Sequence, residues 1–257
     1  MNVTSPELTF LHLAAACDLL ETVYYGHALC SSYRLDASAP GGIAQRGRDD
    51  APLTSVEKIT AFLDRIGRSH GSAKAQSALK LIRNGSRSPM ESALAMLFGL
   101  PSKHGGFGLG DVHLNRSVRV YQGTDGFGKP RWGERIPDLT IVGKSRNGSE
   151  RAVAIDYDSR SIHASSRAMG KDAIRRNELA SSSSMIHFTV TTDQALDFAK
   201  LSGVADQVRR ALGKRKSPKP RAGLPPAENR RHLELVQSKR IALWSKYVCY
   251  SAFRQME

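Results

Sequence analysis

The chain has 257 residues, of which 40% are hydrophobic and 24% are charged, and these proportions are ordinary for a folded globular protein. No apolar run approaches the roughly 20 residues that a membrane-spanning helix needs, and residues 1–9 lack the basic-then-apolar order of a secretory signal. Cys17, Cys30 and Cys249 have no metal-ligand spacing, which predicts reduced thiols in a cytoplasmic protein without a membrane partner.

The charge of the chain indicates a polyanionic partner. Its formal net charge is +14 and its pI is near 10.0, so its field attracts nucleic acid at long range. Between residues 200 and 240, twelve Lys and Arg stand against three acids, and the basic run Lys214-Arg215-Lys216 is a predicted DNA-binding segment. The alternative is a basic surface that only aids solubility. The prolines in this stretch predict an exposed linker.

Residues 1–85 predict a helical region. Apolar residues recur at helical spacing over residues 7–29, a polar loop follows over residues 36–52, and Ser55 begins another helix. A further helix is predicted over residues 73–83, after a glycine-containing turn. Two short helices around such a turn are typical of a helix-turn-helix motif or of a simple helical hairpin. No base-contacting pattern is recognisable, which favours the hairpin.

Residues 86–213 predict an α/β domain. Ser88-Pro89-Met90-Glu91 has the residues that begin a helix, and the helix ends near Gly99. The elements predicted after it are strands over residues 112–121, 139–142 and 153–157, a helix over 166–180, a strand over 185–190 and a helix over 193–212. The glycines between residues 105 and 110 neither follow a strand nor begin a helix, so they do not form a phosphate-binding loop.

Residues 214–257 combine the basic linker with one predicted helix over residues 227–253. One face of this helix is loosely apolar and carries Leu233, Val236, Leu243, Trp244, Tyr247 and Val248. The helix can pack on the α/β domain, pair with another copy to form a homo-oligomer, or lie along nucleic acid. Packing is the usual outcome for such a stripe.

Three carboxylates gather where two predicted strands meet. Side chains alternate along a strand, so Asp156 and Asp158 project to one side, and antiparallel pairing of the two strands places Asp138 beside them. The other side, toward the core, takes Val153, Ile155 and Tyr157. Such a cluster is self-repelling unless a divalent cation neutralises it or water screens it at an exposed turn. Hard oxygen ligands suit Mg²⁺ or Mn²⁺, which can activate water against a phosphodiester.

These residues, in this order, resemble the PD-(D/E)XK nuclease superfamily. Pro137-Asp138 begins one strand, Asp156-Tyr157-Asp158 ends the next, and Glu91 lies in the preceding helix. More narrowly, the chain is similar to small endonuclease-like domains related to very-short-patch-repair endonucleases, which also occur in proteins resembling abortive-infection antitoxins. The residues that carry this narrower resemblance are Ser88-Pro89-Met90-Glu91, Asp138, Asp156-Tyr157-Asp158-Ser159, His163, Lys171-Asp172 and Arg175-Arg176. The resemblance spans about half the chain and implies a restriction-endonuclease-like αβββαβ core.

The resemblance also implies roles for individual residues. Asp138 and Asp156 would be ligands of Mg²⁺ or Mn²⁺, with Glu91 a further ligand, although Glu91 also fits a helix cap. His163 would be a general base or acid. The implied catalytic residues are Asp138, Asp156, Asp158, His163 and Lys171, and the implied phosphate-binding residues are Lys171, Arg175 and Arg176. Asp158 stands where the superfamily has a water-activating lysine, so the resemblance assigns that role to no residue here.

The sequence therefore supports three hypotheses. The first is a metal-dependent DNA endonuclease that hydrolyses phosphodiesters in repair or in defence against foreign DNA. The second is a catalytically inactive DNA-binding regulator or antitoxin-like protein with the same fold, motivated by the missing lysine. The third is a protein-interaction module that assembles through its C-terminal helix.

Overall fold

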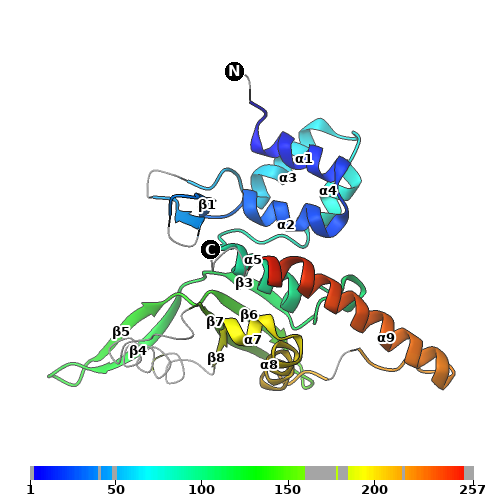
Figure 1. Cartoon of the computed structure of the whole chain (residues 1–257). Helices are drawn as coiled ribbons and strands as arrows, with labels where there is room; N and C mark the ends of the chain where they lie inside the picture. The colour runs from blue at the N-terminus through cyan, green and yellow to red at the C-terminus, as the bar shows by residue number, and fades with distance from the viewer. Residues whose placement is uncertain are drawn as a thin grey trace.

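The computed structural model describes residues 3–39, 42–47, 51–159, 178, 185–215 and 218–251. It is a mixed α/β structure with N-terminal helices, a mixed four-stranded sheet and C-terminal helices (Figure 1). The α/β class predicted from the sequence is thereby confirmed. The predicted helix over residues 166–180 lies outside the described residues, apart from Glu178, which is helical.

Among the described residues of the N-terminal part there are four helices. They are α1 (Pro6–Ala16), α2 (Leu19–Leu29), α3 (Val56–Ile66) and α4 (Ser72–Leu79). The helical segment predicted over residues 7–29 consists of two helices, because Asp18 caps a new one. Its side chain accepts from the backbone N–H of Glu21, and the Glu21 carboxylate accepts from the backbone N–H of Asp18. Ser55 begins α3 as predicted. Helices α3 and α4 pack on each other and on α1.

A short hairpin follows α2, and its second strand lies within the segment predicted to be a loop. Strand β1 (Tyr33–Leu35) pairs antiparallel with β2 (Ile43–Gln45). At the base of the hairpin, the Ser32 backbone N–H donates to the carbonyl of Ser86, and the Ser32 carbonyl accepts from the backbone N–H of Arg46. The hairpin is therefore attached to the segment that leads into the next helix.

That helix, α5 (Pro89–Gly99), is the centre of the core. Ser88 caps it as predicted, since its hydroxyl oxygen accepts from the backbone N–H of Glu91. Every residue from Pro89 to Phe98 is buried. The helix packs against α2 on one side and against the sheet on the other, so it joins the N-terminal helices to the sheet (Figure 1). A turn of 3-10 helix, η2 (Ser102–His104), follows it.

The sheet has the strand order β3-β6-β7-β8. Strands β3 (Asp111–Leu114), β6 (Leu139–Lys144) and β7 (Glu150–Asp158) are antiparallel neighbours, and β8 (Ile186–Thr191) runs parallel to β7. Register places Val112, Ile141 and Val153 on one face, where all three are buried toward α5.

The predicted strand over residues 112–121 is in fact two strands. Asn115 has a φ of 49° and ends β3, because this left-handed conformation breaks an extended ladder. The chain then forms a separate hairpin from β4 (Val118–Thr124) and β5 (Pro130–Arg135). Strand β5 was not predicted, since its sequence has no apolar alternation.

The predicted helix over residues 193–212 is likewise divided. Helix α7 (Thr192–Leu196) ends before Asp197, whose carboxylate accepts from the backbone N–H groups of Ala199 and Lys200 and so begins α8 (Phe198–Ala211). The C-terminal helix is α9 (Pro226–Leu243), continued by the π-helical turn η3 (Trp244–Cys249).

Of the three placements considered for the C-terminal helix, packing is the one observed. Leu243, Tyr247 and Val248 join the core cluster, and the Trp244 indole donates to the carbonyl of Ala195 at 2.7 Å. Pairing with a second copy is a prediction that a single chain does not test.

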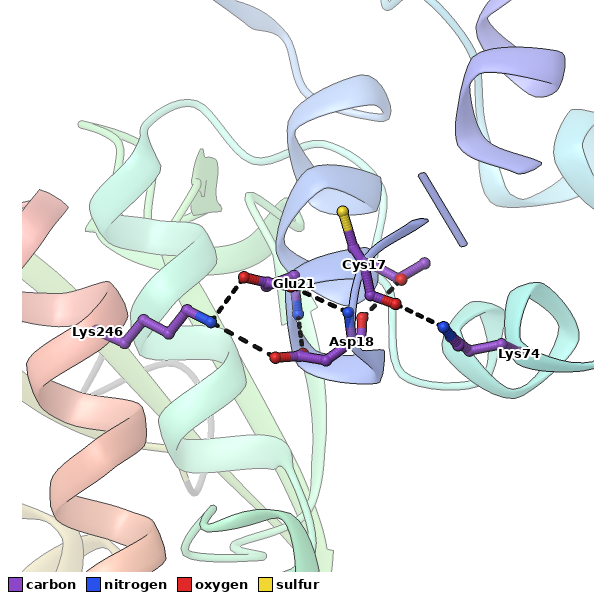
Figure 2. A network of polar contacts seen from close by, with 6 residues as sticks. Cys17, Asp18, Glu21, Lys74 and Lys246 are labelled. Atoms are coloured by element: carbon purple, nitrogen blue, oxygen red, sulfur yellow. Dashed lines mark hydrogen bonds and ion pairs between the residues drawn. The ribbon is translucent and has the colours of Figure 1, made fainter. Parts of the chain in front are cut away.

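A surface network of charges holds the C-terminal helix against the N-terminal ones (Figure 2). The Lys246 ammonium lies 2.8 Å from the Glu21 carboxylate and 3.5 Å from that of Asp18. Lys74 on α4 donates to the carbonyl of Cys17, just before Asp18, at 2.6 Å. Segments more than two hundred residues apart are thus joined around the N-terminus of α2.

Cys17, Cys30 and Cys249 are free thiols. Burial raises the pKa of the Cys30 thiol to about 12. Over the part of the chain that the structure describes, none of the helices has the length and apolar character to cross a membrane.

Candidate functional site

Asp138 and Asp156 meet at the end of the β6–β7 ladder. The last paired residues are Leu139 and Ile155, so the next position on each strand holds one of the two aspartates. The Asp138 backbone N–H donates to Asp156 Oδ1 at 3.1 Å, and the Tyr157 N–H donates to Asp138 Oδ2 at 2.7 Å. Each carboxylate therefore accepts a hydrogen bond from the opposite strand, and the predicted adjacency is confirmed.

The strand alternation predicted for β7 also holds. Val153 and Ile155 are fully buried on the core face, and Asp156 is half-buried on the other. Asp158 follows on the same face as Asp156 and pairs in register with Thr191 of β8. The Tyr157 hydroxyl lies 3.0 Å from that of Thr192, and burial raises the pKa of Tyr157.

His187 is a site residue that the sequence reasoning missed. Its Nε2 lies 2.8 Å from Asp156 Oδ2, and its side chain is only 5% exposed. Register pairs His187 with Ala154, two residues before Asp156, so the parallel strand β8 presents the ring to the same face as the carboxylate. The available signal was a single His in a short apolar strand, which is meaningful only once β8 is known to run beside β7.

Glu91, at the third position of α5, lies near Asp138. Its carboxylate accepts from the backbone N–H of Arg87 at 2.8 Å, from the Ser88 hydroxyl at 3.1 Å and from the Asn115 side-chain amide at 2.6 Å. Burial, and then the negative charge of Asp138, raises the pKa of Glu91 to about 7. The capping interpretation of Glu91 is supported, with the difference that the carboxylate bonds the N–H of Arg87 rather than that of Ser88.

Asn115 connects Glu91 to the aspartates. Its backbone N–H donates to the carbonyl of Asp138 at 3.0 Å, while its side-chain amide donates to Glu91 and, at 3.0 Å, to the carbonyl of Gly85. A left-handed asparagine is well suited to this place, because Asn adopts positive φ more readily than most residues. The sequence reasoning did not single it out.

The described residues do not provide a complete metal cage. Within them, no group of three or more His, Cys, Asp or Glu is arranged to hold a metal ion. Glu91, Asp138 and Asp156 therefore do not form a three-ligand site in this structure. The Asp138–Asp156 pair has the right chemistry for Mg²⁺, which commonly binds through one or two carboxylates and completes its shell with water and substrate phosphate.

The predicted basic residues fall into two groups. Lys214 is half-buried and donates from Nζ to the carbonyl of Leu109 at 2.7 Å, and burial lowers its pKa. Arg215 beside it is exposed. The other predicted cations, together with the predicted general base, lie outside the described residues: His163, Lys171, Arg175, Arg176 and Lys216.

Comparisons with known proteins do not add to this picture, because no family model, no curated protein and no solved structure matches the chain. The strand topology and the carboxylate chemistry therefore provide the basis for a functional proposal.

Proposed function

We propose that the protein is a metal-dependent DNA endonuclease that hydrolyses phosphodiester bonds in DNA repair or in defence against foreign DNA. The observation that carries the proposal is the adjacency of Asp138 and Asp156 across the ends of β6 and β7. The order α5, β3, β6, β7, β8 supports it, because a helix, three antiparallel strands and a parallel fourth is what a restriction-endonuclease-like core requires. The net charge of +14 supports a polyanionic substrate.

The proposed metal ligands are Asp138 and Asp156, with Mg²⁺ or Mn²⁺ as the ion. A bound ion of this kind would lower the pKa of a coordinated water and offset the charge that develops on the phosphate. His187 would orient Asp156, since its Nε2 contacts the same carboxylate. Asn115 would orient Glu91 and the Asp138 backbone together.

Glu91 then has a role distinct from ligation. Both of its oxygens already accept hydrogen bonds, and its raised pKa reduces its charge beside Asp138 near neutral pH. A neutral Glu91 would leave Asp138 and Asp156 as the two negative ligands. His163 and Lys171 are proposed, on the resemblance alone, as a proton-transfer group and a phosphate-binding group.

The test is cleavage of supercoiled plasmid by the full chain with Mg²⁺ or Mn²⁺. We expect nicked and linear products for the wild type, and none for Asp138→Asn or Asp156→Asn. The matched control is Asp64→Asn, which removes the same charge from an exposed position on α3 and leaves cleavage unchanged. Cleavage that survives both site substitutions, or that persists in excess chelator, would contradict the proposal.

A second candidate is a DNA-binding regulator or antitoxin-like protein that has this fold without turnover. Two observations favour it: the described residues contain no three-ligand group, and Asp158 occupies the position of the superfamily's lysine. It predicts tight, salt-sensitive DNA binding, with log affinity falling by about 0.9 per log unit of salt for each phosphate neutralised, and no cleavage with either metal ion.

A further inference from the structure

The β4–β5 hairpin is separate from the central sheet. Its strands pair only with each other among the described strands, and Figure 1 shows the hairpin extending away from the body of the protein. It leaves the body between Asn115 and Asp138, whose backbones are hydrogen bonded at 3.0 Å. The base of this arm is thus part of the carboxylate site, with Arg135 at the end of β5 only three positions before Asp138.

The tip of the arm is an ordered turn that exposes an aromatic ring. Asp125 Oδ1 accepts from the backbone N–H groups of Phe127 and Lys129, both at 2.9 Å, and the Asp125 N–H donates to the carbonyl of Lys129. Gly128 supplies the positive φ of 79° that the turn needs. Phe127 is 93% exposed. A turn held by four backbone groups therefore presents an apolar ring to solvent, although burial of the ring does not stabilise the turn.

One face of the arm carries two aromatic rings, one arginine and one glutamate. Register places Arg119 opposite Glu134 and Tyr121 opposite Trp132, so these residues share a face. The Arg119 guanidinium lies 4.7 Å from the centre of the Trp132 ring, and the Tyr121 ring meets Trp132 edge-on at 5.6 Å. Trp132 is 46% exposed.

The opposite face of the arm is turned toward the protein. Val120 is 1% exposed, and Gln122 and Arg135 both contact the Glu178 carboxylate, at 3.3 Å and 2.5 Å. These contacts cover that face, so the face with Arg119 and Trp132 is the one available to a partner.

The charge of the arm identifies the kind of partner. Residues 116–135 contain five Lys and Arg against two acids. The five are Arg116, Arg119, Lys129, Arg131 and Arg135. A two-stranded ribbon is narrow enough for the major groove of B-DNA, apolar side chains can contact the thymine methyl groups there, and Arg and Lys bind the flanking phosphates.

We propose that the β4–β5 arm binds duplex DNA, with the ribbon in the major groove, Phe127 and Trp132 against the bases, and Arg119 and Lys129 at the phosphates. The choice of DNA rests on the proposed function, because the arm begins at the carboxylate pair that would cut it. DNA bound by the arm would run past Asp138 at its base.

The test measures affinity for a fluorescein-labelled duplex of about 30 base pairs by anisotropy, in chelator, over a range of salt concentrations. Phe127→Ser weakens binding about tenfold, the loss expected for one base contact, and leaves the backbone bonds of the turn in place. Arg119→Ala lowers the slope of log affinity against log salt by about 0.9, the loss of one phosphate contact. The matched controls are Leu53→Ser and Arg68→Ala, exposed residues of the N-terminal region that change neither quantity.

Wild-type affinity in both arm variants would overturn the proposal, and so would a clear preference for single-stranded over duplex DNA that depends on Phe127. Cleavage assays on the same proteins separate this proposal from the function on which it rests. A protein that binds through the arm and never cuts refutes the endonuclease alone. A protein that cuts normally with Phe127→Ser and Arg119→Ala, at unchanged affinity, refutes the arm alone.

Discussion

Two polar networks join distant parts of this chain, and they differ mainly in burial. The network in Figure 2 ties Lys246 to Asp18 and Glu21 on the surface, where the three side chains are 49%, 60% and 33% exposed. The site network ties Asp156 to His187, whose side chains are 14% and 5% exposed. Water screens the charges of the surface network, whereas the buried charges of the site network are screened much less.

This difference in burial changes the pKa values of the carboxylates in the two networks. In the surface network, hydrogen bonds and Lys246 hold the pKa of Glu21 below its ordinary value, so the carboxylate is charged and solvated. At the site, burial raises the pKa of Glu91 to about 7 in spite of three hydrogen bonds. Burial therefore decides whether a carboxylate in this protein serves as a fixed charge or titrates near neutral pH.

The largest expected effect is a pH dependence of stability due to Glu91. Its pKa rises from the ordinary 4.5 to about 7 on folding, so the folded state binds the proton more tightly. The stabilisation is therefore fully present below pH 4.5 and is lost as pH rises to about 7, a change of about 3 kcal/mol. Urea denaturation of the wild type and Glu91→Gln at several pH values measures it.

Comparing the wild type with Glu91→Gln removes the contribution of the other titratable groups. The stability of the wild type relative to Glu91→Gln falls from about pH 4.5, continues to fall as the pH rises through about 7, and is constant well above that. Stability curves that run parallel across this range would show that Glu91 titrates normally.

The next effect comes from removing one carboxylate from each network. Asp156→Ala leaves the His187 Nε2 and the Asp138 N–H without their acceptor in a buried setting, which costs about 2–3 kcal/mol. Glu21→Ala removes an exposed carboxylate and one half of the α2 capping box, which costs about 1 kcal/mol. Chemical denaturation of both variants checks the order, and equal losses would contradict the role of burial.

Asn115 allows the site network to be divided into backbone and side-chain parts. Asn115→Ala loses the amide bonds to Glu91 and Gly85, and alanine tolerates the left-handed conformation less well than asparagine, for a total of about 2 kcal/mol. Asn115→Gly loses the same bonds without the backbone strain, so it is more stable than Asn115→Ala by about 1 kcal/mol. Thermal denaturation of the pair gives the difference, and equal stability would mean that the backbone is unstrained.

The smallest effect is expected for Lys246. Lys246→Ala removes both surface ion pairs and costs less than about 1 kcal/mol, a loss that shrinks further in high salt. Denaturation in low and high salt measures it. A large loss that is insensitive to salt would show that Lys246 acts through packing of its alkyl chain and not through its charge.

The sequence predicted those parts of the fold that depend on neighbouring residues. Ser55 and Ser88 begin helices where their capping signals stand, since a cap is satisfied within three residues. Asp18 and Asp197 have the same capping chemistry inside apolar runs. Asp18 divides the helical segment predicted over residues 7–29, and Asp197 divides the single helix predicted over residues 193–212. Strand β5 could not be predicted in this way, because Pro130–Arg135 is stabilised by pairing with β4.

In the candidate site too, some positions follow from the sequence and others only from the tertiary structure. The adjacency of Asp138 and Asp156 follows from the sequence by itself, because strand alternation and antiparallel pairing of two consecutive strands determine it. The positions of His187 and Asn115 were decided only by the tertiary structure, since one depends on a parallel strand and the other on a left-handed break in β3. The titration of Glu91 depends on burial by the whole core, which no local pattern encodes. Local hydrogen bonding and side-chain alternation can be predicted from neighbours, whereas burial and the pairing of remote segments depend on the assembled chain.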